Sequence, residues 1–398
     1  MRTGAVAAGA LSFGPTFWAE ALAAPARAGR GPYGPLGTAD SNGVALPEGF
    51  TARAIARGAT RVEGTDYTWH IFSDGAATFA TPDGGWVLVS NSEVPTPVEV
   101  GLPIVGDLGE GGASAIRFRP DGSIADAYRI LSGTSSNCAG GPTPWGTWLS
   151  CEEIDRGLVW ECDPLGARDA VARPAMGSFK HEAVCVDPRR GHAYLSEDEP
   201  DGCLYRFKPA RKDDLSEGRL QVAVVGRRGF VEWKPVPDPA ATSTATRDQV
   251  PGAKRFRRGE GIWFDGGVVY LATTGDSKIR AYDTRRKKIT PVYDPERLTD
   301  PPLSDVDNVT VARSGDLFVC ENSGGDDGID ICVITPKPSR EVARFLKVSG
   351  PAHGNPETEA SSEAAGVVFD PSGRRMYFSS QRAFGVGTVY EVTGPFRG

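Results

Sequence analysis

The sequence predicts an all-β protein, and three observations carry that prediction. Stretches rich in Val, Tyr, Phe and Leu alternate with turn residues, and no long stretch has the periodicity of a helix. Gly (50) and Pro (31) are spread evenly and together make about a fifth of the 398 residues. One strand–turn–strand unit also recurs along the chain. Together these features favour many short strands joined by tight turns.

The recurring unit is clearest from His181, where HEAVCVDPRRGHAYLSEDEPDGCLYRFKP reads as three strands separated by an Asp-Pro turn and a Gly turn. Related units begin at Ala77, Cys138, Gly259, Asp307 and Glu363. Each unit has about the size of a four-stranded propeller blade. The sequence therefore predicts a β-propeller of six blades of four antiparallel strands, with inserted loops. Seven blades is the alternative, and a β-sandwich would not need the repeated unit.

The length suits a single propeller domain, which we expect to span residues 29–398. Its largest insertion is expected near residues 211–257, a polar stretch that contains Pro and is basic near its end.

Residues 1–28 are expected to be an export signal. Met1–Ala26 is rich in small apolar residues, and Ala21-Leu22-Ala23 fits a small-residue cleavage site. The weak apolar character is typical of twin-arginine export, but the Arg pair is missing, so we expect the signal to be truncated at its start. The alternative is a short N-terminal helix of the mature protein. Export implies a periplasmic or extracellular protein.

Charge and composition exclude several classes of function. The formal charge is −7 and no long basic run occurs, which does not favour binding to nucleic acid or to an anionic membrane. No later stretch approaches the length of an integral membrane span. The presence of only 4 His does not favour a His-rich zinc or copper centre. A metal site would have to use carboxylates, amides, backbone carbonyls or Cys, which favours hard ions such as Ca²⁺, Mg²⁺ or Fe³⁺.

Acidic residues recur at equivalent positions of the units. At the openings of units stand Glu182, Glu260, Asp307 and, slightly earlier, Glu363, with Cys138 in the same place. Near the end of the second strand stand Glu93, Glu152 with Glu153, Glu197 with Asp198, and Glu321, while Thr274 and Gln381 take these places in the other two units.

Equivalent positions of propeller blades gather around one axis, so these acids are expected to form a ring at the central channel. Such a ring would repel itself unless cations neutralise it, and oxygen-ligated cations need more donors than one blade supplies. Capping of turns and pairing with Lys or Arg is the better interpretation of any single acid. For the whole set we favour a metal site.

Cys138 differs from the other cysteines because it stands where other units have Glu or Asp and is followed closely by two glycines. A thiolate among carboxylates is tolerable beside a metal ion, which deprotonates it. We rank a metal ligand first, a buried small residue second, and a nucleophile activated by His181 third.

The remaining cysteines leave room for disulfides. Cys151 with Cys162, and Cys320 with Cys332, lie on consecutive strands of their units and are candidates for bonds across a hairpin in an exported protein.

A family resemblance adds to this interpretation. The run NCAGGPTPWGTWLSCEE, residues 137–153, resembles the signature of the bacterial alkaline phosphatase PhoX family. Later motifs resemble those of the family in the same order, namely FKHEAV (179–184), RGEGIWF (258–264), DVDNVTV (305–311), FVCEN (318–322) and SSEAAGVVFDPSG (361–373). The resemblance covers most of the chain from about Gly75 onward.

The resemblance implies a β-propeller that hydrolyses phosphate monoesters at two iron ions bridged by a Cys sulfur, with calcium ions nearby. Matched by motif, Cys138 is the expected bridging ligand, and Glu153, Glu182 and Glu260 are expected metal ligands. Further expected ligands are Glu93, Asp307 and Glu321. Arg258 is expected to hold the substrate phosphate as the catalytic residue, and a guanidinium suits bidentate phosphate contact.

The resemblance also implies a small-molecule phosphate ester as substrate. We expect a monomer with no nucleic acid partner. Two departures from the family pattern stand out. Glu93 lies in NSE, where a His commonly precedes the Glu, and Gln381-Arg382 lies where a His is expected.

Two other functions stay open. One is a Ca²⁺-dependent lactonase or esterase, which would need the acids but has no use for Cys138 or Arg258. The other is a non-catalytic binding propeller stabilised by Ca²⁺.

Overall fold

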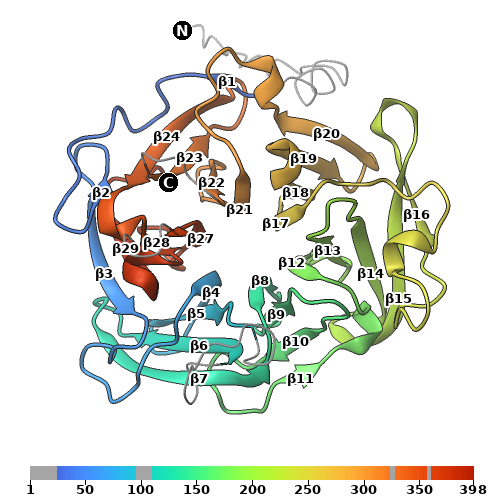
Figure 1. Cartoon of the computed structure of the whole chain (residues 1–398), viewed down its shortest axis with the longest axis horizontal. Coiled ribbons are helices and arrows are strands. Elements are labelled where there is room, and N and C mark those ends of the chain that lie inside the picture. Colours follow the sequence, from blue (N-terminus) through green and yellow to red (C-terminus); the bar gives the residue numbers. More distant parts are fainter. Residues whose placement is uncertain (1–24, 96–109, 323–327, 356–359) are drawn as a thin grey trace, which may run out of the picture.

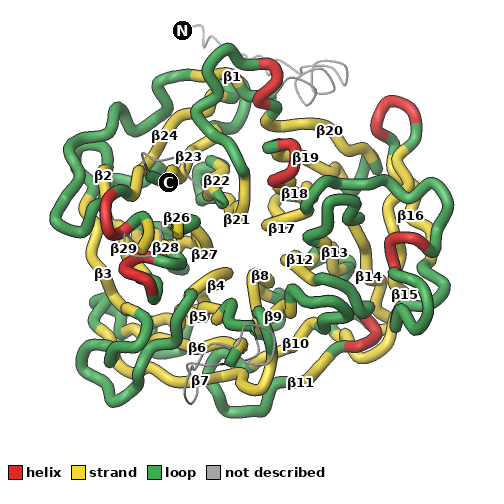
Figure 2. Tube along the Cα trace, in the orientation of Figure 1, coloured by secondary structure: helices red, strands yellow, loops and turns green. Residues whose placement is uncertain are grey.

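The computed structural model describes residues 25–95, 110–322, 328–355 and 360–398. In these residues the predicted architecture is confirmed, because six antiparallel sheets are arranged as blades around a central axis (Figure 1). The helical elements of the described residues are short 3-10 turns in the connecting loops (Figure 2). They are η2 (Pro174–Met176), η3 (Arg227–Gly229), η4 (Thr246–Asp248), η5 (Thr274–Asp276), η6 (Pro295–Arg297), η7 (Gly350–Ala352) and η8 (Ala383–Gly385).

The first three blades follow the chain from the channel outward. Blade one is β4 (Ser73–Ala80), β5 (Trp86–Ser92), β6 (Gly111–Phe118) and β7 (Ile124–Thr134). Blade two is β8 (Asn137–Pro142), β9 (Trp148–Glu152), β10 (Val159–Cys162) and β11 (Val171–Ala172). Blade three is β12 (His181–Val186), β13 (Ala193–Glu197), β14 (Leu204–Arg211), β15 (Asp214–Val225) and β16 (Val231–Pro235).

The other blades repeat this order. Blade four is β17 (Gly259–Asp265), β18 (Val268–Thr273), β19 (Lys278–Asp283) and β20 (Lys288–Tyr293). Blade five is β21 (Val306–Val311), β22 (Leu317–Glu321), β23 (Ile329–Ile334) and β24 (Glu341–Val348), with β1 (Arg27–Ala28) and β2 (Val44–Ala45) paired to β24. Blade six is β27 (Ala364–Phe369), β28 (Arg375–Ser380), β29 (Thr388–Thr393) and β3 (Thr51–Arg57). The hairpin β25 (Gly354–Asn355) and β26 (Ala360–Ser361) precedes it.

The ring closes through blade six, where the early strand β3 pairs with the last strand, β29. Glu391 on β29 is buried and accepts hydrogen bonds from Arg53 of β3 (2.8 Å), Arg375 (2.9 Å) and Tyr377 (3.0 Å). Closure therefore joins the two ends of the chain by a sheet and by a buried polar cluster.

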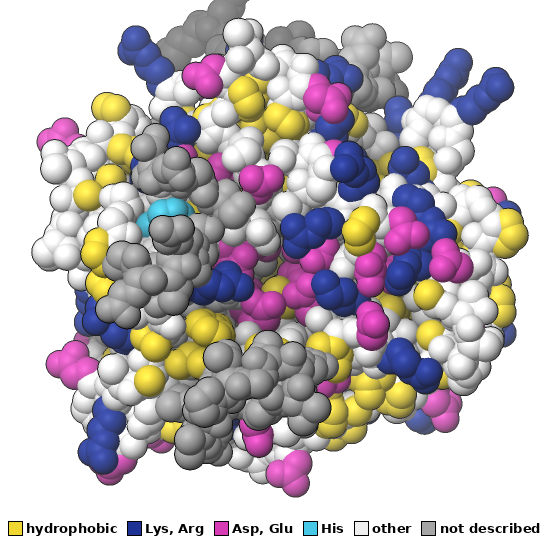
Figure 3. All heavy atoms as spheres, in the orientation of Figure 1, with side chains coloured by type: hydrophobic (Ala, Val, Ile, Leu, Met, Phe, Trp, Pro, Cys, Tyr) yellow, Lys and Arg dark blue, Asp and Glu magenta, His cyan; other side chains and the backbone are white. Residues whose placement is uncertain are grey.

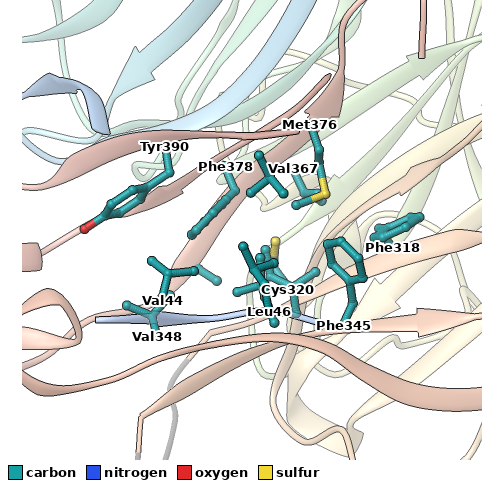
Figure 4. Close-up of a cluster of buried hydrophobic side chains, with 14 of the residues drawn as sticks. Val44, Leu46, Phe318, Cys320, Phe345, Val348, Val367, Met376, Phe378 and Tyr390 are labelled. Atoms are coloured by element: carbon teal, nitrogen blue, oxygen red, sulfur yellow. The ribbon is translucent and has the colours of Figure 1, made fainter. Parts of the chain in front are cut away.

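The cores lie between neighbouring blades, because each sheet buries both of its faces. The cluster between blades five and six joins Phe318 and Phe345 to Phe378 and Tyr390, and the N-terminal Val44 also packs there (Figure 4). These interblade cores fix each first strand beside the channel.

The insertion near residues 211–257 contains β15 and β16, which extend blade three to five strands. Most of the expected export signal, residues 1–24, lies outside the described residues, whereas Arg27–Ala28 forms strand β1. Within the described residues, no helix is long and apolar enough to cross a membrane.

Candidate metal centre at the channel axis

Every first strand carries a β-bulge near the residue that points to the channel. In five blades the pairing shifts between the first and fourth residues of the strand, as between His181 and Val184 of β12. In β27 the shift lies between Ala365 and Val368. A bulge bends a strand and re-aims a side chain, so it is well suited to turn one residue per blade toward the axis.

One backbone hydrogen bond per blade sets the register of the site. The residue after each second strand donates its N–H to the residue just before the first strand, as Glu153 does to Ser136. These donors form a second ring: Glu93, Glu153, Asp198, Thr274, Asn322 and Gln381. The bulged position lies two residues after each acceptor. The residues at this position form the first ring: Asp74, Cys138, Glu182, Glu260, Asp307 and Ala365.

The entry to the first strand is conformationally strained in four blades. Phe72, Ser136, Arg258 and Asp305 all have positive φ, between 39° and 52°. For non-glycine residues this left-handed region is uncommon and costs on the order of 1 kcal/mol. Repeated strain at one position of the fold points to a functional constraint on the residues that follow.

Small residues follow the first ring because neighbouring first strands approach closely. A Cβ atom on Gly75 would lie 2.4 Å from the Cα atom of Ala139, and one on Gly261 would lie 2.6 Å from the Cα atom of Asn308. Larger side chains there would push the strands apart and widen the ring.

The two rings supply three groups of ligand atoms, each with its atoms within 4.8 Å of one another. The first is Asp74, Glu93 and Cys138, the second is Cys138, Glu153 and Glu182, and the third is Glu182, Glu260 and Asp307. Cys138 belongs to the first two groups and Glu182 to the last two. The three groups therefore form a continuous series in which a thiol and a carboxyl each stand between two candidate cation positions.

Several oxygens of these groups are buried without a hydrogen-bond partner. They include Oδ1 of Asp74, both carboxyl oxygens of Glu182, and Oε1 of Glu260, which lies 3.1 Å from Arg258. Burying a polar group without a partner is costly, and burying a charge without one costs more. Carboxylate and thiolate donors of this kind fit hard cations and iron.

The raised pKa values of the ring residues also indicate that the site needs positive charge. Burial, together with neighbouring carboxylates, raises the pKa of Glu182 and of Asp74 well above their usual range. Burial, with the Glu93 carboxylate next in importance, raises the pKa of Glu153 to about 8. Burial and Asp74 likewise raise the pKa of the Cys138 thiol. Ionising the whole set would require a compensating cation.

Three basic side chains border the groups and pair with the second ring. Arg258 contacts Asp198 through Nε and Nη2, both at 2.9 Å, and Lys180 contacts Glu153 at 2.9 Å. Arg382 lies 3.2 Å from Glu363 and 3.9 Å from Glu93. The Arg258 side chain is 38% exposed, so the guanidinium reaches solvent at the channel mouth.

Acidic side chains gather at this mouth, and Lys and Arg side chains lie around them (Figure 3). Next to the mouth, Lys180 also lines a cavity of about 360 Å³ whose other walls include Arg156, Phe179 and residues 241–247. The cavity has room for the organic part of a small molecule beside the ring.

Seven of the eight residues predicted from the sequence lie at the rings or beside them. Glu182, Glu260, Asp307 and Cys138 belong to the first ring, Glu93 and Glu153 to the second, and Arg258 borders both. Glu321 lies outside the three groups. Its carboxyl accepts hydrogen bonds from the backbone of Ser304 and Asp330, each at 2.9 Å.

Glu321 is one residue out of register with the second ring. Its equivalents are Glu152 and Glu197, which also accept backbone hydrogen bonds, from Leu158 (3.1 Å) and Cys203 (3.0 Å) respectively. These acids hold the turn to the third strand, and Asn322 takes the ring position. The sequence shows the repeat, but it does not show which of two neighbouring residues faces the axis.

Asp74 is the site residue that sequence analysis missed. It is buried, and Gln381 donates a hydrogen bond of 2.5 Å to its Oδ2. The unit in blade one was started at Ala77, after the bulge. Aligning the acid–Gly pair Asp74-Gly75 with Glu260-Gly261 would have found it.

The structure also bears on the other hypotheses about the cysteines, namely a nucleophile activated by His181 and two disulfides. His181 contacts the Gly177 carbonyl at 3.1 Å through Nε2, and burial lowers its pKa to about 3, so a basic role beside Cys138 has no support. All seven cysteines are free and buried, and the two hypothesised disulfides are absent. In the β9–β10 pair, Cys151 faces Val159 and Cys162 faces Trp148, which puts the two thiols on different rungs.

A protein-family comparison matches this region. The model described as Alkaline phosphatase PhoX matches residues 111–296, which include Cys138, Glu153, Glu182, Arg258 and Glu260. The resemblance predicted from the sequence is therefore confirmed. No curated protein matches the chain.

Solved structures similar to the chain include a PhoX. Pseudomonas fluorescens PhoX in complex with vanadate, a transition-state analogue, superposes with a TM-score of 0.71 at 17% identity, covering 90% of this chain and 97% of that one. A gluconolactonase of Xanthomonas campestris gives 0.50 at 15% identity, with 92% and 99% covered. A Bacteroides thetaiotaomicron protein of unknown function gives 0.52 at 9% identity, with 86% and 76% covered. At these identities the structures establish the shared propeller fold.

Proposed function

We propose that this chain is a phosphatase that hydrolyses small-molecule phosphate monoesters at a metal cluster held by the two rings. The observation that carries the proposal is the coincidence of three things at one channel mouth. Buried acids, several of which have an oxygen without a hydrogen-bond partner, form a series with a thiol. A solvent-reaching guanidinium stands beside them, and the stretch that matches the PhoX family model contains the thiol and the guanidinium.

The residues that would hold the metal ions are those of the three groups, of which Cys138 and Glu182 each belong to two. When bound, such ions neutralise the charge of a phosphoryl group and supply an activated oxygen nucleophile for in-line attack. We assign iron to the positions that Cys138 shares and calcium to the remaining oxygen ligands, following the softness of the donors.

Arg258 is the residue that would bind the substrate phosphate. The bond to Asp198 raises the pKa of Arg258, so the guanidinium stays charged throughout the reaction. The same bidentate contact fixes its plane at the mouth, and a fixed planar fork suits the geometry of phosphate oxygens. The charge is thus oriented before the substrate arrives, which lowers the cost of stabilising a developing negative charge.

Lys180 is a second cation for the same site. Although burial works against its charged form, Glu153 and Asp198 raise the pKa of Lys180. The cavity that Lys180 lines would receive the alcohol part of the ester. We further infer export directed by residues 1–28, a periplasmic or extracellular location, a propeller domain over residues 29–398 and a monomeric state.

The test compares ester and lactone hydrolysis in paired variants. Because Arg258 contacts substrate in the proposal, Arg258→Lys should lower kcat/KM for a phosphate monoester by about a hundredfold. Arg255→Lys is the matched control, since Arg255 pairs with the exposed Asp248 away from the rings. Cys138→Ser should lose bound iron and ester hydrolysis together.

A Ca²⁺-dependent lactonase is the competing function, and the same variants distinguish it. It predicts lactone hydrolysis that survives Cys138→Ser and Arg258→Lys. Such a result, with no phosphate ester turned over by the wild type, would overturn the proposal. A non-catalytic propeller would bind calcium and hydrolyse neither substrate.

A further inference from the structure

A basic surface lies on the rim of the propeller, away from the channel. The hairpin between β15 and β16 reaches the turn between β19 and β20, as its position beside β20 in Figure 1 shows. The two are fixed together, because the N–H of Val231 donates to the Lys287 carbonyl at 2.8 Å and Phe230 forms an isolated bridge with Lys288. A Cβ atom on Gly229 would lie 2.3 Å from the Ile289 carbonyl, so the approach is close.

We call this surface the basic hairpin patch. It consists of Arg227, Arg228 and Phe230 from the hairpin and Arg285, Arg286, Lys287 and Lys288 from the turn. In Figure 3, basic side chains project from the upper right of the molecule, where Figure 1 has the hairpin. The turn alone is a run of four cations, which the sequence analysis passed over because it is short.

Few acids oppose these charges. Among the described residues, Arg286 is the patch cation with an ion pair, to Asp283 at 3.1 Å. The nearby Glu232 on β16 lies 3.8 Å from Lys234. The positive field extends further, since burial, then Arg340 and Arg286, lower the pKa of Lys337 to about 8. The patch is therefore strongly positive on a chain whose formal charge is −7.

Phe230 stands among these cations at the hairpin tip. Its side chain is 55% exposed, the highest value among the exposed large hydrophobic residues of the described chain. An exposed aromatic residue costs solubility unless something covers it, and here it is surrounded by charges rather than by other apolar residues. Aromatic residues that project among Lys and Arg are typical of surfaces that rest on lipid headgroups.

We propose that the basic hairpin patch docks the protein on an anionic lipid surface, with Phe230 entering the interface. The positive charge of the patch complements the negative charge of the lipid headgroups. At physiological salt, charges act over about 8 Å, so acids elsewhere on the molecule do not cancel the charge of the patch. A convex hairpin tip also suits a flat surface better than it suits a polyanion chain, which is held in a groove. The rim position keeps the patch away from the first strands at the centre of the propeller (Figure 1).

Vesicle co-sedimentation of the full chain tests this docking. We expect binding to vesicles of phosphatidylglycerol and phosphatidylcholine in equal parts, weakening as salt rises, and no binding to phosphatidylcholine alone. The double variant Arg227→Glu with Arg228→Glu should weaken binding by about tenfold or more. Phe230→Ser should weaken it by about threefold and leave its salt dependence unchanged.

The matched control reverses two exposed charges of the same blade, Arg211→Glu with Lys212→Glu, and should bind as the wild type does. All of these variants are surface changes, and unchanged thermal unfolding checks that each is folded. Binding of the wild type to both kinds of vesicle, or undiminished binding by the double variant, would overturn the proposal. Binding to soluble heparin with none to anionic vesicles would overturn it in favour of a polyanion partner.

Discussion

Each blade contributes one residue to the first ring, and the chemistry of the site follows from which residue that is. Five blades supply a ligand atom and the sixth supplies Ala365. At the same end of the site, Gln381 donates to Glu93 at 2.5 Å and Arg382 pairs with Glu363. Blade six therefore contributes an amide and an internal cation, whereas each of the other blades contributes at least one carboxyl or thiol to the three groups.

Asp74 gives the sharpest test of the ring, because its role came from geometry alone. Asp74→Asn keeps the size of the side chain and removes one charge from the first group, so the protein should lose metal from that group. Glu152→Gln is the control, since Glu152 stands one residue outside the second ring and serves the backbone. Metal analysis after gel filtration measures both variants, and equal losses in the two would refute the assignment.

Asp198 is expected to act as a positioning residue through Arg258. Asp198→Asn weakens the two contacts that orient the guanidinium, so KM for a phosphate ester should rise by about tenfold while iron content is unchanged. Asp198→Glu should restore part of the effect. If the variant lost iron in proportion to activity, Asp198 would be a ligand instead.

Sequence analysis identified the chemistry of most ring residues but not their register. The types were readable because acids recurred with the repeat and because Cys138 broke the pattern. Asp74 and Glu321 were misjudged because the bulge adds a residue to the first strand, so counting along the chain does not say which neighbour faces the axis. That direction is set by pairing with the second strand.

The blades were predictable where strands pair with their neighbours in sequence. The first three strands of each unit have local turn signals, and six blades are present. The pairing of β3 with β29 was not predictable from local patterns, since it joins residues at opposite ends of the chain and depends on how many blades close the ring. The same holds for β1 and β2 on blade five.

The closing sheet should be sensitive to its buried acid. Glu391→Ala removes the acceptor of Arg375 and Tyr377, and leaves buried polar groups unpaired, so it should cost about 2–3 kcal/mol of unfolding free energy. This loss of unfolding free energy is smaller than for a fully buried ion pair, because the Arg53 side chain is half exposed. Asp66→Ala, which breaks the exposed pair with Arg61, should leave the free energy of unfolding nearly unchanged. Urea unfolding compares them, and equal costs would contradict a role in closure.

The stability of the whole molecule should depend on pH without metal and much less so with metal. Burial raises the pKa of Glu93 and of Asp307 to about 7, above the usual carboxyl range. Groups with raised pKa values stabilise the fold at low pH and lose that contribution as pH rises through the folded pKa. The metal-free protein should therefore become less stable from about pH 5 to pH 8.

Bound cations should remove this loss, because they replace the protons on the ring. Unfolding midpoints at the two pH values, with a chelator or with added iron and calcium, measure the difference. A metal-free protein that gains stability over this range would show that the ring acids are not buried as described.

The metal content of the purified wild-type chain decides between a metal cluster and a merely acidic channel. The proposed function, which takes its metals from the family resemblance, predicts about two iron ions per chain together with calcium. Calcium alone would leave Cys138 as a buried thiol and favour the lactonase or binding functions. A chain that holds no metal after mild purification, yet is fully folded at neutral pH, would contradict the account.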